Sequence, residues 1–177
     1  MLKEFGKEET SKLFSDFTCP KNPDVEEFIR SPSKAIRFEE SDQSRTYLIL
    51  DDETGLILAY FSISFKELFL GGFDVPKNQI KKLDGMRKDV ERIRVFLIGQ
   101  LAKNYSVKNN QLTLKNILEE VYAVIDQVRT LVGGRAIILE CEDNARLIGL
   151  YLEHGFKVLN TIEDTDQLIT MYIHISK

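Results

Sequence analysis

The sequence predicts one α/β domain over residues 1–177, with a central mixed sheet that has helices on both faces. Three observations support this fold class. The chain has 177 residues and 43% hydrophobic content, which is enough for one well-packed core. Two apolar runs joined by a short polar loop are typical of an antiparallel strand pair. Strands and helices alternate in the second half, which predicts a parallel pair with a crossover helix.

The first half begins with a polar stretch, which we do not assign to an element, and continues with two short helical pieces in 22–43. Asn22 or Asp24 is a suitable cap for the first piece, and Pro32 opens the second. Apolar, β-branched and aromatic residues then form the expected strands 45–52 and 55–64. The polar sequence DDETG between them contains a glycine, so we expect a hairpin.

Residues 66–90 mix glycine, proline and charge, and we expect an irregular insertion that is partly helical near its beginning. The next segment, 92–103, is a long apolar run and predicts a strand. A polar loop separates it from a strongly periodic helix at about 112–131. Gly133 and Gly134 end that helix.

The continuously apolar run 135–141 predicts a buried strand parallel to 92–103. A short amphipathic helix follows in the stretch 144–156. The runs FKVLNTI and LITMYIHI then predict a final antiparallel hairpin joined by EDTDQ. In such a sheet a ligand is expected where the parallel strands end, at their carboxyl termini.

Composition limits the partners and the compartment. A net charge of −4 argues against a surface that is basic throughout, although a local basic patch would still allow nucleic acid as a possible but not favoured partner. Cys19 and Cys141 have no metal-type spacing, so we expect no metal site and a reducing, cytoplasmic location. No apolar run is long enough to cross a membrane, and we expect no membrane partner.

A patch for nucleic acid would draw on the basic residues in and around the insertion. Their ordinary interpretation is a solvated face, which we prefer. The candidates are Lys77, Lys81, Lys82, Arg87, Lys88, Arg92 and Arg94.

The stretch 144–156 carries the main functional signal. Asn144 and Tyr151 are seven residues apart, so their side chains share one face of a helix, which Gly155 closes. Taken alone, this is an ordinary amphipathic helix with a core aromatic. The functional interpretation makes Asn144 a ligand contact and Tyr151 an acid.

Three segments resemble a known family: IGQLAKN on the strand 92–103, GGRAIILECED on the strand 135–141, and NARLIGLYLEHGFK after it. Together with the order of elements they resemble the GNAT superfamily of acyl-CoA-dependent N-acyltransferases. The segments FTCPKNPDVEEFIRS, SRTYLILDD and LILAYFSIS are similar to a bacterial GNAT branch that includes tRNA-acetylating toxins and related acetyltransferases.

The resemblance implies a GNAT-like fold with a splayed parallel strand pair and the transfer of an acetyl group from acetyl-CoA, the cosubstrate, to an amine. The acceptor amine is left open between a small molecule, a protein and an aminoacyl-tRNA. A homodimer is compatible with the resemblance. No metal cofactor is implied.

The resemblance also assigns roles to residues. The main chain of Leu101, Ala102 and Lys103 would hold the pantetheine arm. Asn144 would contact that arm or fix the splay, and Tyr151 would protonate the departing thiolate. Glu140, near the end of its strand, is a candidate general base.

The family's phosphate-binding loop usually contains two glycines, which are absent here. The matching positions are Lys108, Asn109, Asn110, Gln111, Leu112 and Thr113. Asparagine tolerates a left-handed backbone, and a lysine can neutralise phosphate, so a glycine-free anion loop is physically possible. The alternative hypothesis is a GNAT-fold binding or regulatory module with weakened or lost catalysis.

Three other residues have ordinary structural interpretations. We expect His154 to cap its helix, Gln100 to be structural and Cys141 to act as a buried small hydrophobe. His174 has no partner visible in the sequence.

Overall fold

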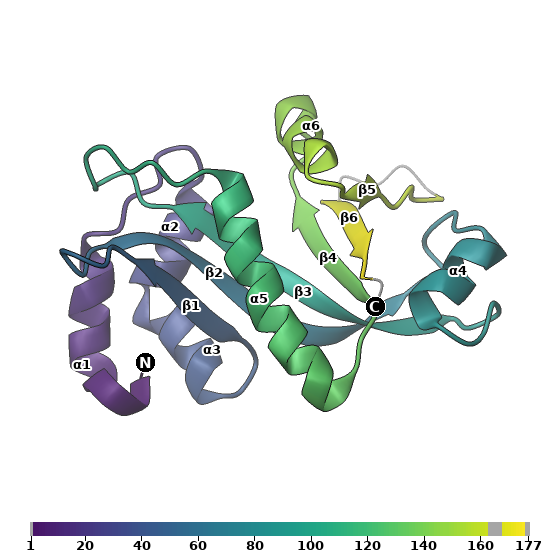
Figure 1. Cartoon of the computed structure of the whole chain (residues 1–177), viewed down its shortest axis with the longest axis horizontal. Coiled ribbons are helices and arrows are strands. Elements are labelled where there is room, and N and C mark those ends of the chain that lie inside the picture. Colours follow the sequence, from purple (N-terminus) through teal and green to yellow (C-terminus); the bar gives the residue numbers. More distant parts are fainter. Residues whose placement is uncertain (1, 163–167, 176–177) are drawn as a thin grey trace. The chain divides into compact units, whose positions relative to one another are not determined.

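The computed structural model describes residues 2–162 and 168–175, and the expected mixed α/β fold is confirmed (Figure 1). Six strands form a sheet in the order β1-β2-β3-β4-β6-β5. The strands are β1 (Arg45–Leu50), β2 (Ile57–Phe69), β3 (Arg92–Lys103), β4 (Ala136–Cys141), β5 (Lys157–Val158) and β6 (Ile169–His174). The α-helices are α1 (Leu2–Ser15), α2 (Pro23–Arg30), α3 (Arg37–Glu40), α4 (Lys77–Asp84), α5 (Leu114–Val132) and α6 (Ala145–Glu153), and the π-helix η1 (Pro32–Ile36) precedes α3.

The chain divides into two compact units. The first unit contains Met1–Ser64 and Gly99–Ala123, and the second contains Phe65–Ile98 and Val124–Lys177. Strands β2 and β3 and helix α5 each run from one unit into the other. The expected single domain stays a prediction.

In the first unit, β1 and β2 form the predicted antiparallel hairpin, with Arg45 opposite Ile63. Its loop is held by Asp51, whose side chain accepts hydrogen bonds from the backbone N–H and the hydroxyl of Thr54, at 2.8 and 2.6 Å. Gly55 follows with a φ of +70°, the left-handed conformation for which glycine is suited.

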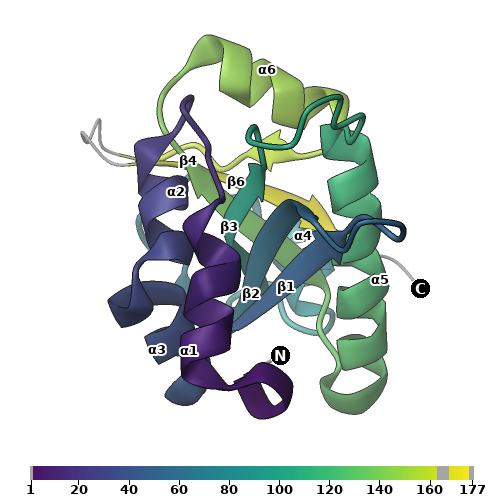
Figure 2. The same cartoon turned by 90° about the vertical axis from the view of Figure 1, so that its left-hand side faces the viewer.

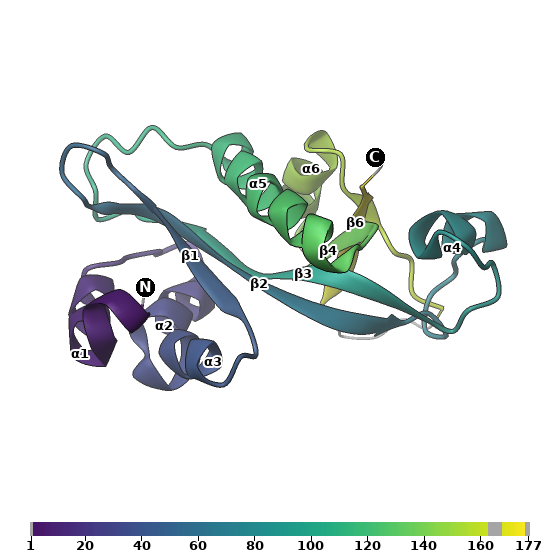
Figure 3. The same ribbon diagram turned by 60° about the horizontal axis from the view of Figure 1, so that its bottom comes forward.

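The helices of the first unit cover β1 and β2. Asn22, one of the two expected caps, caps α2 by accepting from the backbone N–H of Asp24 at 3.1 Å, and Pro32 opens η1. Helix α1 was not predicted, because its first turns are polar and charged. Figure 3 shows α1–α3 on one face of β1 and β2, and the first half of α5 on the opposite face.

The core under α1–α3 contains three buried aromatic side chains. Phe14 and Phe17 pack with Ile29 of α2 and Tyr60 of β2, and all four are fully or almost fully buried. The rings of Phe17 and Tyr60 meet edge to face, 5.1 Å apart. The hydroxyl of Tyr60 donates to the carbonyl oxygen of Val25, so α2 is fixed to the sheet by both packing and a hydrogen bond.

The insertion 66–90 differs from the prediction. Its beginning continues β2 to Phe69, and the helix α4 lies in the middle of the segment, so the expected helix near the beginning was wrong. Leu68 is buried in the second unit's core, which favours an extended strand there. Helix α4 buries Leu83 in the same core and ends at Gly85, with a φ of +96°.

The second unit contains the only parallel pairing among the described registers, so the predicted parallel pair is confirmed. Residues Phe96–Ile98 of β3 pair with Ile137–Leu139 of β4. Gly134 precedes β4 with a φ of +122°, and a Cβ atom there would lie 2.3 Å from the ring of Phe96. A glycine is therefore required at this position by both backbone conformation and space.

The final hairpin is also confirmed, since β5 and β6 pair antiparallel, with Lys157 opposite Tyr172. Strand β5 is shorter than the run 156–162 predicted; a single bridge joins Thr161 to Phe73. The joining segment EDTDQ, 163–167, lies outside the described residues.

Candidate active site

Strand β3 extends past its parallel pairing. The register with β4 ends at Ile98 and Leu139, and β3 continues for five more residues, to Lys103. Leu101, Ala102 and Lys103 therefore lie on the extension. The expected splay requires that β3 and β4 stop pairing before the end of β3. In the described register the two strands pair only at Phe96–Ile98 of β3.

The side chains of this extension break the normal alternation of a strand. A Cβ atom on Gly99 would point at the hydroxyl of Ser62, 3.1 Å away, and Ser62 shares a face of β2 with Tyr60. Ala102 packs in the same cluster as Tyr60. Residues 99 and 102 thus face the same side although they are three positions apart, which requires one extra residue between them, as in a β-bulge.

Asn104 fixes the end of β3 from inside the first unit, and sequence reasoning missed it. Its side chain is buried and accepts from the backbone N–H groups of Thr18 and Ser106, both at 3.0 Å. Its amide nitrogen donates to the carbonyl oxygen of Ile57 at 2.8 Å. A buried amide with these bonds holds the start of the loop 104–113 against β2.

The loop is braced by two further side chains. The ammonium group of Lys103 donates to the carbonyl oxygens of Asn110 and Leu112, at 2.7 and 2.8 Å. The amide nitrogen of Asn110 donates to the carbonyl oxygens of Leu58 and Asn104, at 2.8 and 3.0 Å. These contacts link the loop to β2 and to the end of β3. The bond from Asn110 to Leu58 spans 52 residues of sequence, so local pattern reasoning could not predict it.

Asn109 has the left-handed conformation, with a φ of +57°. This is the conformation that we expected asparagine to supply in place of glycine, and Asn109 is exposed. The side-chain amide of Gln111 donates to the carbonyl oxygen of Asn109 at 3.1 Å.

Two backbone N–H groups at the end of the loop are already engaged. The N–H of Leu112 donates to the side chain of Asn110 at 3.1 Å, and that of Thr113 donates to the side chain of Asn116 at 3.0 Å. The hydroxyl of Thr113 also donates to Asn116, at 2.7 Å. Side chains thus take the donors that a phosphate would otherwise use at the start of α5.

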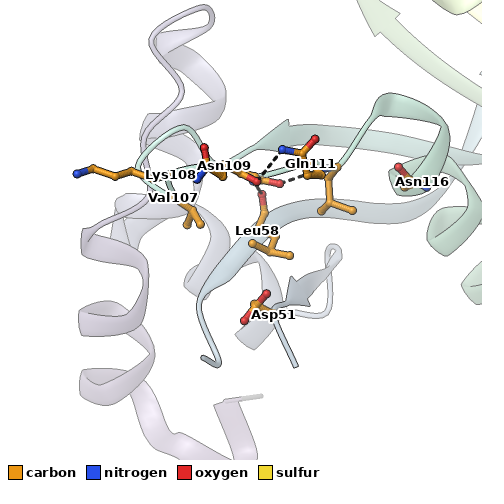
Figure 4. Close-up of a pocket in the computed structure, with 9 residues that line it drawn as sticks. Asp51, Leu58, Val107, Lys108, Asn109, Gln111 and Asn116 are labelled. Atoms are coloured by element: carbon orange, nitrogen blue, oxygen red, sulfur yellow. Dashed lines mark hydrogen bonds between the residues drawn. The ribbon is translucent and has the colours of Figure 1, made fainter. Parts of the chain in front are cut away.

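A pocket of about 370 Å³ opens on this loop and lies wholly in the first unit (Figure 4). Figure 4 shows the side chain of Lys108 extending outward from the loop. Asp51 is on the opposite wall, and the hydrogen bonds from Thr54 hold the pKa of its carboxyl below the ordinary value. The lining residues are Asp51, Leu58, Val107, Lys108, Asn109, Asn110, Gln111, Leu112 and Asn116.

In the second unit, Asn144 is the N-cap of α6. Its side-chain oxygen accepts from the backbone N–H groups of Arg146 and Leu147, at 3.0 and 3.2 Å. The helix lies beyond the C-terminal end of β4 (Figures 1 and 2). Asn144 thus has a structural role that an asparagine before an apolar helix could have indicated.

Tyr151 lies on α6 with its ring edge-to-face against Phe156, at 5.8 Å between centroids. Burial, with a smaller contribution from the nearby Cys141 thiol, raises the pKa of Tyr151 to about 12. The hydroxyl is therefore protonated at neutral pH and is able to donate a proton.

Glu140 forms an ion pair with Lys66 of β2, with 2.9 Å between Oε1 and Nζ. Both side chains are about one-third exposed. Sequence reasoning did not single out Lys66, because its partner is distant in the chain. The pair holds one oxygen of the candidate base.

The remaining candidates have mainly structural contacts. The ring of His154 lies 2.8 Å from the carbonyl oxygen of Leu150, as expected for a cap. Cys141 is buried, and burial raises the pKa of its thiol. His174 lies 3.5 Å from the guanidinium of Arg135. Within residues 2–162 and 168–175, no group of three acidic, histidine or cysteine side chains is arranged to hold a metal.

The basic residues of the insertion are spread over three segments. Lys77, Lys81 and Lys82 lie on α4. Arg87 pairs with an aspartate at 3.4 Å, and Arg92 pairs with a glutamate at 3.9 Å. Among the helices described, none is long and apolar enough to cross a membrane.

Solved structures with the same fold were found by comparison. AtaT complexed with acetyl-methionyl-tRNAfMet matches with a TM-score of 0.69 and 15% identity, over 91% of this chain and 86% of that chain. A tyrosine-to-phenylalanine mutant of KacT matches with a TM-score of 0.68 and 18% identity over the same shares. AtaTR bound with AcCoA matches with a TM-score of 0.67 and 15% identity, again over 91% and 86%.

These likenesses show that the chain has the GNAT fold, as the sequence resemblance implied. Neither a protein-family model nor a curated protein matches the sequence.

Proposed function

We propose that the protein is an N-acetyltransferase that transfers an acetyl group from acetyl-CoA to an amine. The observation that carries this proposal is Tyr151, a tyrosine that is protonated at neutral pH and lies on the helix after β4 of a GNAT fold. A structure of AtaT with its antitoxin fragment also contains acetyl-CoA, which supports the choice of donor.

In the proposed reaction every bond and proton is accounted for. The amine nitrogen attacks the thioester carbonyl, a C–N bond forms, and the C–S bond breaks. The hydroxyl of Tyr151 gives its proton to the leaving thiolate, and Glu140, directly or through water, takes the proton that the amine loses. Backbone donors stabilise the oxyanion, and positioning supplies much of the remaining acceleration.

The donor would use main-chain groups of the β3 extension. In this proposal the backbone of Leu101, Ala102 and Lys103 holds the pantetheine arm, and Asn144 contacts that arm or fixes the splay. The loop from Lys108 to Thr113 takes the pyrophosphate. Lys108 is exposed and able to approach a phosphate group.

Among the acceptor classes, an aminoacyl-tRNA is supported by the complex of AtaT with acetyl-methionyl-tRNAfMet. If this chain uses such an acceptor, its affinity for the tRNA should decrease steeply as salt increases. An affinity that does not change with salt would exclude this class and leave a small molecule or a protein as the acceptor.

Calorimetric titration with acetyl-CoA, followed by thiol release in the presence of a panel of amines, tests the proposal. In thermal unfolding, acetyl-CoA at 100 times its Kd should raise the free energy of unfolding by about 2.7 kcal/mol. Release of CoA that depends on one amine, together with an acetylated product, would establish the activity.

A second candidate is a GNAT-fold binding or regulatory module. It is favoured by the loop, where Asn110 and Asn116 already occupy the N–H groups of Leu112 and Thr113, and by the Asp51 carboxylate on the pocket wall. In that case millimolar acetyl-CoA would give no thermal stabilisation, and no amine would promote thiol release.

A further inference from the structure

The second unit contains a ribbon of two neighbouring strands, the end of β2 and the start of β3. The guanidinium of Arg92 lies over the ring of Phe69, 5.4 Å from its centroid. Four residues away on each strand, the rings of Phe65 and Phe96 are 5.1 Å apart. These two contacts show that the strands run antiparallel and that the residues of each pair lie side by side.

The residues midway between these two contacts are charged. The same register places Glu67 opposite Arg94, and Glu67 also forms a long ion pair with Arg92, at 3.9 Å. Within the part of the chain that the structure describes, Arg94 has no ion pair of its own. We call this side of the ribbon the β2–β3 face, and its residues are Phe65, Glu67 and Phe69 of β2 and Arg92, Arg94 and Phe96 of β3.

The β2–β3 face is exposed, whereas the other side of the ribbon is buried. Residues that alternate with the face, such as Leu68 and Val95, pack in the core of the second unit. On the face itself, Phe65 and Phe69 are 46% and 49% exposed. Both arginines of the face are exposed as well. The ribbon therefore presents aromatic rings and guanidinium groups to the solvent.

The C-terminal end of α5 lies beside the same face. A Cβ atom on Gly134 would lie 2.3 Å from the ring of Phe96, so the chain that leaves α5 passes over this side of the ribbon. Leu131 and Val132, the last two residues of α5, are 84% and 62% exposed. Large apolar side chains exposed together mark a surface that binds another molecule.

Composition and charge favour a protein as the occupant of the β2–β3 face. Aromatic and arginine side chains are enriched in protein interfaces. A surface for nucleic acid requires an excess of positive charge. Here Glu67 offsets one of the two arginines, and Asp89 and Glu91 precede them in the chain. The exposed Leu131 and Val132 also have no group that could contact a phosphate.

The β2–β3 face is complementary to itself. A two-fold axis that runs parallel to the strands, midway between them, would bring β2 of one copy over β3 of the other. Phe69 would then meet Arg92 of the second copy, and Glu67 would meet Arg94 of the second copy. Because the axis is two-fold, each cation–π contact and each ion pair would form twice.

We propose that the protein forms a symmetric homodimer through the β2–β3 face. The second copy would cover the exposed rings of Phe65 and Phe69. It would also supply the carboxylate partner that Arg94 lacks within one copy. This inference concerns assembly and does not depend on acetyl transfer.

Sedimentation velocity of the full chain measures the dimer. Interfaces of standard size have a Kd in the micromolar range or below, so the parent should be dimeric at about 100 μM. Glu67→Arg would place an arginine against Arg94 of the second copy, and Arg94→Glu would place a glutamate against Glu67. Since each repulsion occurs twice, each variant should raise the Kd of the dimer at least about 10-fold. Both side chains are exposed, so both variants should fold.

An equimolar mixture of Glu67→Arg and Arg94→Glu is the decisive measurement. In a mixed dimer every reversed charge faces an opposite charge of the other copy, although like charges remain side by side within each copy. The mixture should therefore recover a Kd close to that of the parent. Lys81→Glu is the matched control and should dimerise as the parent does, because α4 packs on the buried side of the ribbon through Leu83.

Several results would overturn the proposal. A parent that is monomeric at about 100 μM has no such dimer. A dimer that neither variant weakens has its interface elsewhere, and folded variants that do not recover in the mixture would exclude this alignment of the two copies. If the parent is monomeric and binds a labelled single-stranded RNA in fluorescence anisotropy, and Arg94→Glu abolishes that binding, the face binds nucleic acid instead.

Discussion

Lys66 and Glu140 are joined by an ion pair across two strands, with their charged atoms 2.9 Å apart. Because both side chains are about one-third exposed, the pair contributes little to stability, at most about 1 kcal/mol. Glu140→Gln should therefore fold normally. We expect it to decrease kcat/KM about 10²-fold or more if Glu140 is the general base. Lys66→Gln is the control for the ion pair, and an equal, small effect of both changes would exclude the base role.

Tyr151→Phe should reduce turnover by about 10² to 10⁴ while acetyl-CoA affinity and melting temperature stay nearly unchanged. The replacement keeps the ring that packs on Phe156 and removes only the hydroxyl. Steady-state kinetics and calorimetric titration measure the two effects. Tyr172→Phe, at a buried tyrosine of β6, is the matched control. Full activity of Tyr151→Phe would make Tyr151 a packing residue.

Lys108→Glu should weaken acetyl-CoA binding about 5- to 10-fold, because it replaces a favourable surface charge with a repulsive one. The effect should shrink as salt screens the charges. Titrations at two salt concentrations measure it, and Lys12→Glu on the exposed face of α1 is the control. Equal affinity of the Lys108 variant and the parent at low salt would mean that the loop does not approach phosphate.

Acid should destabilise the fold through His174. Burial, followed by the charges of Lys82 and Arg135, holds the pKa of His174 below its ordinary value of 6.5. The unfolded chain therefore takes up this proton at higher pH than the folded chain does. The free energy of unfolding should decrease as pH falls through about 6.5. Urea titrations at pH 7 and 5 should show a smaller decrease for His174→Gln, and an identical decrease would contradict the assignment.

Thermal unfolding should be a single cooperative transition. Strands β2 and β3 and helix α5 each belong to both compact units, so neither unit can unfold without disrupting elements of the other. We expect the calorimetric and van't Hoff enthalpies to agree. Two resolved transitions would contradict the prediction of one domain over 1–177.

The regular elements of the fold could be predicted because their signals are local. The hairpin 45–64 follows from two apolar runs and a glycine turn, and the helix at 112–131 follows from its period. Helix α1 was missed because its start is polar and its apolar contacts, such as Phe14 with Tyr60, depend on tertiary packing. The position of α4 was wrong because the burial of Leu68 extends β2 into the insertion.

The candidate site was only partly accessible from the sequence. Asn109 has the left-handed backbone that its residue type allows. The bracing of the loop could not be predicted, because Asn110 binds a carbonyl oxygen of β2, 52 residues away in the sequence. Lys66, the ion-pair partner of Glu140, is also far from it in the sequence. The position of Asn144 before an apolar helix indicates a helix cap, but we interpreted Asn144 only as a ligand contact.

The bonds of Asn110 make the loop sensitive to a common form of chemical ageing. Spontaneous deamidation converts asparagine to aspartate, replacing an amide nitrogen with a carboxylate oxygen. At Asn110 the new oxygen would lie against the carbonyl oxygens of Leu58 and Asn104, at positions where the present nitrogen donates at 2.8 and 3.0 Å. Two attractive contacts would become repulsive without any change in side-chain size. Stored protein that has undergone this change should therefore lose the shape of the loop, and mass spectrometry would detect the change as a gain of about one dalton.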